Sequence, residues 1–339
     1  MKYWQIATGA EGRNYKSLCL RYGVAFVGGP KNKERMIKEV KAGHVIVLKH
    51  GTKELIAVGI VRQDAKEVKD KEWLRDLDGW GADAYCRVNW KLPESIPELE
   101  LPDRGFTRTT IQLIDDSKIR AAAKRILEEG KSNKSEDEPL NPESIDVDRL
   151  VESTVSDRSL HDDLKNRINK IIELAKYYQG LQWGKGNIPR GGEIREHEIR
   201  TFLVIPLLLS LGWSEKRLKI ELSCKGSRKR VDIACFRNEY KGKPDDCVVV
   251  VETKKFISGL DYAKDQALSY QKFFPSCRSI VVTNGYCYKI FEKEGEGKKF
   301  RNEPSAYLNL LNPTEKYPLD LQVGGACDAL EWLLPNKYA

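Results

Sequence analysis

The chain has 339 residues, which is long for one compact domain and suits two. Apolar residues make up 40% of it and charged residues 32%, so it can form hydrophobic cores and is not expected to be disordered. Lysine and arginine outnumber aspartate and glutamate by 58 to 50, a net charge of +8 that suits a polyanionic partner but also an ordinary basic protein.

The sequence predicts no membrane segment. Its longest apolar run, from Phe202 to Trp213, is interrupted by Pro206 and falls short of the roughly 20 residues that cross a bilayer. The first residues lack the pattern of a signal peptide. The 8 cysteines are scattered without a CxxC pair, which argues against a structural zinc site and favours reduced thiols. We therefore expect a cytoplasmic protein.

Residues 1–127 are predicted to form a β-rich domain. Short apolar or alternating runs bounded by Gly, Pro and charged residues predict strands at 3–7, 44–48, 55–61 and 85–90. A helix is predicted at 116–129. The stretch that follows combines Gly, Ser, Pro and charge, so we assign 128–155 as an interdomain linker.

A second domain is predicted at 156–335. It opens with an amphipathic helix, whose apolar stripe either packs on the domain core or pairs with a second copy. The stripe consists of Leu160, Leu164, Ile168, Ile171, Ile172 and Ala175. Further helices are predicted at 193–211 and 262–273, and strands at 220–222, 231–236, 248–253 and 279–283. This order is typical of a mixed sheet with flanking helices, and the whole chain is expected to be a two-domain α/β (α+β) protein.

Three residues at two predicted strands have the chemistry of a metal-dependent hydrolase. Asp232 lies in one strand, and Glu252 and Lys254 follow a run of valines in the next. Period-two alternation places Glu252 and Lys254 on one face. If Asp232 is on the neighbouring strand, both carboxylates converge on one divalent cation, expected to be Mg²⁺, with Mn²⁺ as a substitute. The ion would polarise a phosphate and activate a water that Lys254 orients.

Other interpretations of these residues stay open. An isolated pattern of this kind is more simply explained by acids that end strands and form surface ion pairs, but the flanking valine run favours catalysis. A basic run just before Asp232 is either a solvated turn or a set of phosphate contacts. It consists of Lys225, Arg228, Lys229 and Arg230.

Residues from about 193 to 292 resemble the N-terminal nuclease domain of type I restriction endonuclease R subunits, a branch of the PD-(D/E)XK superfamily. Besides Asp232, Glu252 and Lys254, the matching motifs are Glu196-His197-Glu198-Ile199-Arg200, Pro206, Leu211-Gly212-Trp213, Gln266-Ala267-Leu268-Ser269-Tyr270 and Thr283-Asn284-Gly285. The resemblance implies a carboxylate from the first helix near the metal, namely Glu196, with Glu198 as a rival. It also implies that Gln266 and Tyr270 face DNA. No GxxxxGK[ST] loop occurs, so the helicase motor of that family is not expected.

Residues 1–125 more weakly resemble the EVE and PUA-like superfamily, small β-barrels that include readers of modified bases. The matching segments are Tyr3–Ala7, Val40–Leu48, Leu55–Val61 and Arg87–Trp90. Such readers flip a base out of the duplex and stack it on aromatic rings. The expected stacking residues are Trp4, Phe26 and Trp80, although aromatic residues are more often part of a core. Asn14 and His44 are candidate hydrogen-bonding partners of the base.

Together these features predict a modification-dependent restriction endonuclease that cuts double-stranded DNA carrying modified cytosine. One alternative is a nuclease that recognises unmodified sequence, DNA structure or RNA. The other is a DNA-binding module that has lost catalysis. Cutting both strands normally needs two active sites, so we expect a homodimer and no membrane partner.

Overall fold

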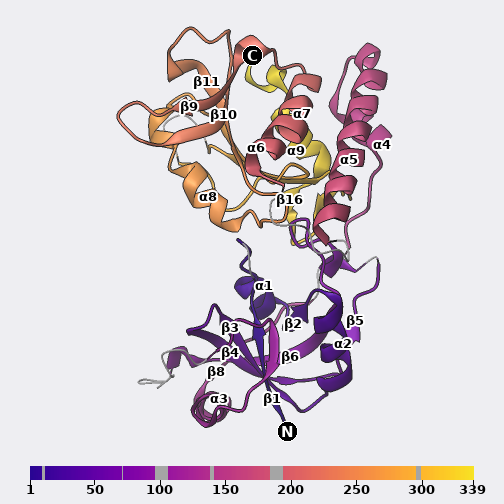
Figure 1. Cartoon of the computed structure of the whole chain (residues 1–339), viewed down its shortest axis with the longest axis vertical. Helices are drawn as coiled ribbons and strands as arrows, with labels where there is room; N and C mark the ends of the chain where they lie inside the picture. The colour runs from indigo at the N-terminus through magenta and orange to yellow at the C-terminus, as the bar shows by residue number, and fades with distance from the viewer. Residues whose placement is uncertain (10–11, 71, 96–105, 138–140, 184–193, 295–298) are drawn as a thin grey trace. The chain divides into compact units, whose positions relative to one another are not determined.

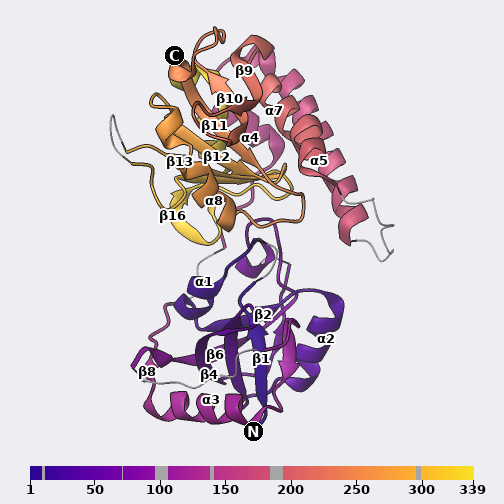
Figure 2. The same ribbon diagram turned by 60° about the vertical axis from the view of Figure 1, so that its left-hand side comes forward.

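The structure is a computed structural model that describes residues 1–9, 12–70, 72–95, 106–137, 141–183, 194–294 and 299–339. The chain divides into two compact units, Met1–Asn141 and Pro142–Ala339, called unit 1 and unit 2 (Figure 1). Each unit has its own sheet (Figure 2). In the described ranges, no helix combines the length and the apolar character that a membrane span requires.

Unit 1 is built around a curled sheet with the strand order β2-β6-β4-β3-β1-β7, to which β5 and β8 add by pairing with β6. The strand bounds are β1 (Tyr3–Ala7), β2 (Val24–Val27), β3 (Val45–His50), β4 (Glu54–Val61), β5 (Lys66–Glu67), β6 (Ala84–Leu92), β7 (Ile111–Leu113) and β8 (Lys131–Ser132). Only β1 and β3 run parallel in this sheet as described. The pairings of the described strands form a half-barrel, where a barrel was expected.

The helices of unit 1 are α1 (Lys16–Arg21), α2 (Pro30–Glu39) and α3 (Ser117–Glu129). Helix α3 confirms the prediction for 116–129. It begins after Asp116, whose carboxylate accepts hydrogen bonds from the backbone N–H groups of Lys118 and Ile119. Its apolar face packs on Val45 and Val58 of the sheet.

Unit 2 holds a mixed sheet with the order β15-β16-β14-β13-β12-β11-β10-β9. The bounds are β9 (Leu218–Ser223), β10 (Arg230–Phe236), β11 (Cys247–Thr253), β12 (Ser279–Thr283), β13 (Cys287–Glu292), β14 (Ala306–Asn309), β15 (Lys316–Tyr317) and β16 (Asp320–Gly324). The central strands β11 and β12 run parallel and are buried along their whole length. This burial explains the run of valines in β11. Helix α8 (Asp261–Leu268) connects β11 to β12, as the parallel pairing requires.

The predicted amphipathic helix is α5 (His161–Trp183). Its stripe from Leu164 to Ala175 is buried in the core of unit 2, so the stripe packs on its own domain. Leu160 falls outside the helix, in the 3₁₀ turn Arg158–Leu160, and is 54% exposed. Helix α9 (Ala326–Leu333) also contributes to this core.

The prediction of a linker at 128–155 needs correction. Its first residues complete α3 and β8, and its last residues form α4 (Val147–Thr154). Leu150 and Val151 of α4 are fully buried in the core of unit 2. Burial of these apolar residues therefore offsets the entropy cost of ordering a short helix. The linker assignment did not take this burial into account.

The predicted helix at 193–211 is interrupted. Glu193 lies outside the described residues; the helix then runs through α6 (Glu196–Ile199), a π-helical turn η4 (Arg200–Val204) and α7 (Ile205–Ser210). Pro206 has no N–H for the carbonyl four residues earlier, and its ring crowds that carbonyl. The wider π turn just before it accommodates this defect, and such turns are frequent at functional sites. The other predicted helix, 262–273, ends early, with α8 followed by a 3₁₀ turn at Gln271–Phe273.

Candidate active site

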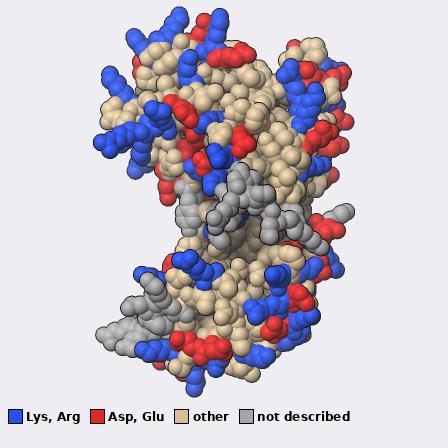
Figure 3. All heavy atoms as spheres, in the orientation of Figure 1, with Lys and Arg blue, Asp and Glu red and all other residues tan. Residues whose placement is uncertain are grey.

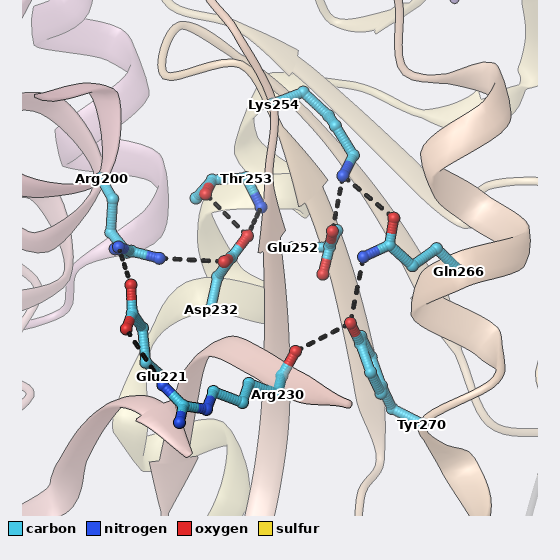
Figure 4. Close-up of polar contacts among 9 residues, drawn as sticks. All are labelled: Arg200, Glu221, Arg230, Asp232, Glu252, Thr253, Lys254, Gln266 and Tyr270. Carbon is cyan, nitrogen blue, oxygen red and sulfur yellow. Dashed lines mark hydrogen bonds and ion pairs between the residues drawn. The ribbon is translucent and has the colours of Figure 1, made fainter. Parts of the chain in front are cut away.

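Strands β10 and β11 place two carboxylates side by side. Ile233 pairs with Val251 in this antiparallel pair, so Asp232 and Glu252 are the next residues on the two strands. Opposed residues on neighbouring strands project from the same face of a sheet. Figure 4 shows both side chains on that face, with Lys254 beside Glu252. The convergence that the sequence predicts for Asp232, Glu252 and Lys254 is present in the structure.

The Asp232 carboxylate is held from two directions. Its Oδ2 atom accepts hydrogen bonds from the backbone N–H and the hydroxyl of Thr253, both at 2.7 Å. Its Oδ1 atom accepts a hydrogen bond from Nη1 of Arg200 at 2.9 Å. These contacts fix the orientation of a side chain that stays 22% exposed.

Glu252 is the more unusual of the two carboxylates. The residue is only 2% exposed, and its Oε1 atom accepts a hydrogen bond from Nζ of Lys254 at 2.6 Å. Its Oε2 atom is buried, and no described residue gives it a hydrogen bond. Burial, followed by the charge of Asp232, raises the pKa of Glu252 to about 7, against the opposing effect of Lys254. The Oε2 atom thus lacks a hydrogen-bond donor, and a bound cation could neutralise its negative charge.

Gln266 and Tyr270 support Lys254 from α8 and the turn after it (Figure 4). The Gln266 Oε1 atom accepts a hydrogen bond from Lys254 at 3.1 Å, and its Nε2 atom donates to the Tyr270 hydroxyl at 3.1 Å. That hydroxyl donates to the carbonyl of Arg230 at 2.9 Å. Tyr270 is 2% exposed, and burial raises its pKa to about 12. Tyr270 therefore supports the site from within and offers almost no surface to DNA. The expectation that Tyr270 faces DNA is wrong.

The expected third carboxylate is not at the site. Glu198 accepts a hydrogen bond from the backbone N–H of Arg195 at 2.8 Å and so caps its own helix, while Glu196 is exposed. Across the described ranges, no three His, Cys, Asp or Glu side chains are grouped closely enough to hold a metal ion. The first helix instead contributes Arg200 to Asp232. The π turn begins at Arg200, so it changes the facing of the residues after Arg200 and not that of Glu196 or Glu198.

Sequence reasoning missed the partnership of Arg200 with Glu221. Nη2 of Arg200 donates to Oε1 of Glu221 in β9 at 2.7 Å, in addition to its bond to Asp232. Glu221 has a φ of 51°, a backbone conformation that is uncommon for residues other than glycine. A glutamate that stands eleven positions before Asp232 carries no spacing signal, so only the folded chain reveals the pair.

The residues present fit a magnesium ion bound by two carboxylates. Mg²⁺ keeps several waters and is commonly held by one or two carboxylates together with the phosphate of a substrate. Asp232 and Glu252 supply hard oxygen ligands, and the partnerless Oε2 atom of Glu252 is one that a cation would satisfy. A third protein carboxylate is not required for this coordination.

The end of β12 and the turn after it support the site from the neighbouring strand. The backbone N–H of Lys254 donates to the carbonyl of Thr283 at 2.8 Å, which fixes the end of the β11 strand. Gly285 has a φ of 97°, and a Cβ atom there would lie 2.6 Å from Leu203 and 2.7 Å from Ile199. Glycine is thus required where the turn touches the helix that carries Arg200.

The basic run that leads into β10 is exposed at all four of its positions, namely Lys225, Arg228, Lys229 and Arg230. Nζ of Lys229 donates to the Ser269 hydroxyl at 2.8 Å, and Arg230 lies 3.8 Å from Glu221. Figure 3 shows that Lys and Arg make up most of the charged surface over the left part of unit 2. The four side chains are therefore accessible from solvent, as a contact with phosphate requires.

In unit 1, two of the predicted stacking residues meet in an aromatic cluster of Tyr15, Phe26 and Trp80. The Tyr15 ring stacks on Trp80 with centroids 5.7 Å apart and 19° between planes, and the Phe26 ring lies 5.5 Å from Tyr15. Trp80 is the partly exposed member, whereas the other two are buried. Gly28 makes room for it, since a Cβ there would lie 2.2 Å from the indole. Sequence reasoning left Tyr15 out of the expected set.

The structure places Trp4 and His44 elsewhere. Trp4 is fully buried, and its indole N–H donates to Nδ1 of His44 at 3.3 Å. A ring with no exposed face has no surface on which a base could stack, so Trp4 is a core residue. Burial lowers the pKa of His44. Asn14 is exposed and accepts a hydrogen bond from the backbone N–H of Lys16.

Comparison with known proteins finds relatives for parts of the chain. Residues 195–304 match the family described as type I restriction enzyme R protein N terminus, which relates this segment to restriction enzymes. No curated protein matches the chain in sequence. A fragment structure of an HsdR subunit of a type I restriction enzyme from Vibrio vulnificus is similar at 20% identity and a TM-score of 0.25, over 33% of this chain and 23% of that one.

A second solved structure is the YTH domain of the Zygosaccharomyces rouxii MRB1 protein in complex with N6-methyladenosine RNA. It is similar at 14% identity and a TM-score of 0.25, over 38% of this chain and 84% of that one. At such TM-scores neither structure bears on the function of this chain. The family match to residues 195–304 is the informative comparison, and it contains Asp232, Glu252 and Lys254.

Proposed function

We propose that unit 2 is a magnesium-dependent nuclease of the PD-(D/E)XK type that hydrolyses phosphodiester bonds in DNA. The observation that carries this proposal is the Oε2 atom of Glu252, buried without a partner among the described residues, beside Asp232 and with Lys254 on the other carboxylate oxygen. The match of residues 195–304 to a restriction-enzyme family supports the same conclusion.

Each residue has a definable task in such a reaction. Asp232 and Glu252 would hold Mg²⁺, which when bound polarises the scissile phosphate and acidifies a coordinated water. Thr253 keeps the Asp232 carboxylate oriented, and its contacts cost no reorganisation during the reaction. Lys254 orients the attacking water and offsets the negative charge that develops on the phosphate. Gln266 holds the Lys254 ammonium in place for this role.

The first test is incubation of the full chain with plasmid DNA in Mg²⁺, in Mn²⁺ and in EDTA. Nicking or linearisation that needs the divalent ion is the expected result. If the chain binds DNA without cutting it in either metal, it is a DNA-binding module that has lost catalysis. Cutting of RNA with DNA left intact would favour the alternative substrate class.

We further propose that unit 1 reads modified cytosine in double-stranded DNA and directs the nuclease to it. The aromatic cluster supports this role, because the partly exposed indole of Trp80 is braced by Tyr15 and offers a rigid face to a flipped base. Stacking of a base on an aromatic ring contributes about 1–3 kcal/mol, enough to offset much of the cost of unstacking it.

The test for unit 1 compares matched plasmids that carry cytosine, 5-methylcytosine, 5-hydroxymethylcytosine or its glucosylated form. Faster cutting of one modified plasmid is expected, and equal cutting of all four would remove the reader role while leaving the nuclease intact. Double-strand breaks would further predict a homodimer on DNA, which analytical ultracentrifugation of the DNA complex in EDTA can detect.

A further inference from the structure

Arg200 is a buried cation shared by two carboxylates. The residue is 8% exposed, and its guanidinium donates to Asp232 at 2.9 Å through Nη1 and to Glu221 at 2.7 Å through Nη2. Figure 4 shows the guanidinium between the two acidic side chains. Arginine suits this position, since its planar group can bond two acceptors at once and stays charged when buried.

The backbone is irregular on both sides of this contact. Arg200 begins the π-helical turn, and Glu221 adopts its positive φ within β9. The pairing of β9 with β10 passes from Val231 to Ile233 and skips Asp232, the residue that would stand opposite Glu221. Strained residues and π turns persist where other contacts enforce them, often at functional sites. The two irregularities meet at one guanidinium.

The contact with Arg200 takes one of the two acceptor positions on the Asp232 oxygen that a metal would need. Two donors from Thr253 saturate Oδ2, which leaves Oδ1 as the atom able to accept a cation. Arg200 already binds Oδ1. A divalent ion on that oxygen would lie within a few ångströms of the guanidinium, and like charges at such a distance in a partly buried site repel strongly. Metal and Arg200 therefore compete for Asp232.

The local charges point the same way. When Glu252 is ionised, acidic side chains are matched one for one by basic ones in the contacts of Figure 4. The acids are Glu221, Asp232 and Glu252, and the bases are Arg200, Arg230 and Lys254. A divalent ion added to this neutral set creates an excess of positive charge, which a phosphodiester anion would reduce.

We propose that Arg200 is the cation of the metal site when no metal is bound. A divalent ion displaces Nη1 of Arg200 from Asp232, and Glu221 keeps the guanidinium beside the site. The freed Nη1 then bonds a non-bridging oxygen of the scissile phosphate. This inference rests on the proposed nuclease function and adds a substrate contact to it. Glu221 is a positioning residue, because it acts only by holding Arg200.

The test is Mn²⁺ binding to the full chain without DNA, measured by calorimetry or by the loss of the free-ion signal in electron paramagnetic resonance. Arg200→Gln is expected to bind Mn²⁺ about tenfold more tightly than the natural chain, yet to cut DNA at least tenfold more slowly. Glu221→Gln should bind Mn²⁺ severalfold more weakly, because Arg200 then stays on Asp232. Thermal melting identifies any variant that fails to fold.

Arg230→Gln is the matched control. It removes the same charge from the other partner of Glu221 but leaves the Asp232 contact intact, so Mn²⁺ affinity without DNA should change less than twofold. Weaker or unchanged Mn²⁺ binding in Arg200→Gln would overturn the inference, as would equal tightening in Arg230→Gln. If Mn²⁺ binds the natural chain and Glu252→Ala abolishes this, the proposed metal site stands even when the Arg200 result fails. No Mn²⁺ binding in any variant would overturn both.

Discussion

The carboxylate of Glu252 lies 2.6 Å from the ammonium of Lys254 through Oε1, while its Oε2 atom is buried with no hydrogen-bond partner among the described residues. The two residues stand at the end of a strand buried along its whole length. The charged side chains therefore lie where the buried strand ends at the edge of the core, and a cation and a phosphate could reach them there.

The stability of the metal-free protein should fall as the pH rises through about 7. The pKa of Glu252 is raised from an ordinary value of 4.5 to about 7 in the folded chain, so the folded state holds a proton that the unfolded chain has released. The stability that this proton contributes is complete below about pH 4.5 and is lost as the pH passes the folded pKa. The loss amounts to roughly 3 kcal/mol.

Glu252→Gln should therefore melt several degrees above the natural chain at pH 8 and at nearly the same temperature at pH 4.5. Roughly 2–4 °C per kcal/mol is expected for a unit of this size. Mg²⁺ should raise the melting temperature of the natural chain at pH 8 but not that of Glu252→Gln. Identical pH profiles for the two proteins, measured by differential scanning calorimetry, would refute the raised pKa.

Gly285→Ala should destabilise unit 2. The new Cβ atom would lie 2.6 Å from Leu203 at a φ of 97°, so steric overlap adds to backbone strain. We expect a loss of about 2–4 kcal/mol in the free energy of unfolding. Gly242→Ala is the control, since its φ of 84° is similar but nothing lies within 4 Å of its added Cβ. Equal losses in the two variants would show that the contact with Leu203 is unimportant.

Neutralising the basic run should weaken DNA binding in a salt-dependent way. Removal of one phosphate contact should reduce the slope of log affinity against log salt by about 0.9 for duplex DNA. Replacement of the four residues by glutamine, with binding measured in EDTA, tests this for Lys225, Arg228, Lys229 and Arg230 together. An unchanged slope would assign the run to a solvated turn.

Trp80→Ala should remove the preference for modified DNA while leaving metal-dependent cutting at its basal rate. Removal of one stacked ring corresponds to about a 5- to 150-fold decrease in affinity for the preferred plasmid. Trp80→Phe keeps an aromatic face and should retain most of the preference. If Trp80→Ala still discriminates modified from unmodified DNA, the aromatic cluster is part of the core and not a reader.

Elements whose sequence shows a clear local pattern were predictable. The strand predicted at 279–283 is Ser279–Thr283, and the run at 248–253 lies within Cys247–Thr253, because strands buried on both faces are continuously apolar. The convergence of Asp232 and Glu252 was predicted only on the condition that their strands are neighbours, and the antiparallel pairing of β10 with β11 meets this condition. Local pattern thus determines the strands, while the pairing of the strands determines the centre of the site.

Features that depend on contacts distant in sequence were not predictable. The pairing of Arg200 with Glu221 lies where a π turn and a skipped strand position meet, and neither irregularity has a periodic signature. The apolar residues of α4 are too few to distinguish a short packed helix from a linker. Trp4 could not be separated from Trp80 by residue type, because burial decides which indole can meet a ligand.

The central claim is that Glu252 and Lys254 carry out hydrolysis of DNA at a divalent cation. Its most direct test is single-turnover plasmid cleavage in Mg²⁺ by Glu252→Ala and Lys254→Ala, with Glu239→Ala as the matched control from an exposed ion pair of the same unit. We predict that both site variants lose cleavage by at least about a thousandfold, that their DNA binding in EDTA is nearly unchanged, and that the control cuts normally. Cleavage by Glu252→Ala at the rate of the natural chain would contradict the proposed function.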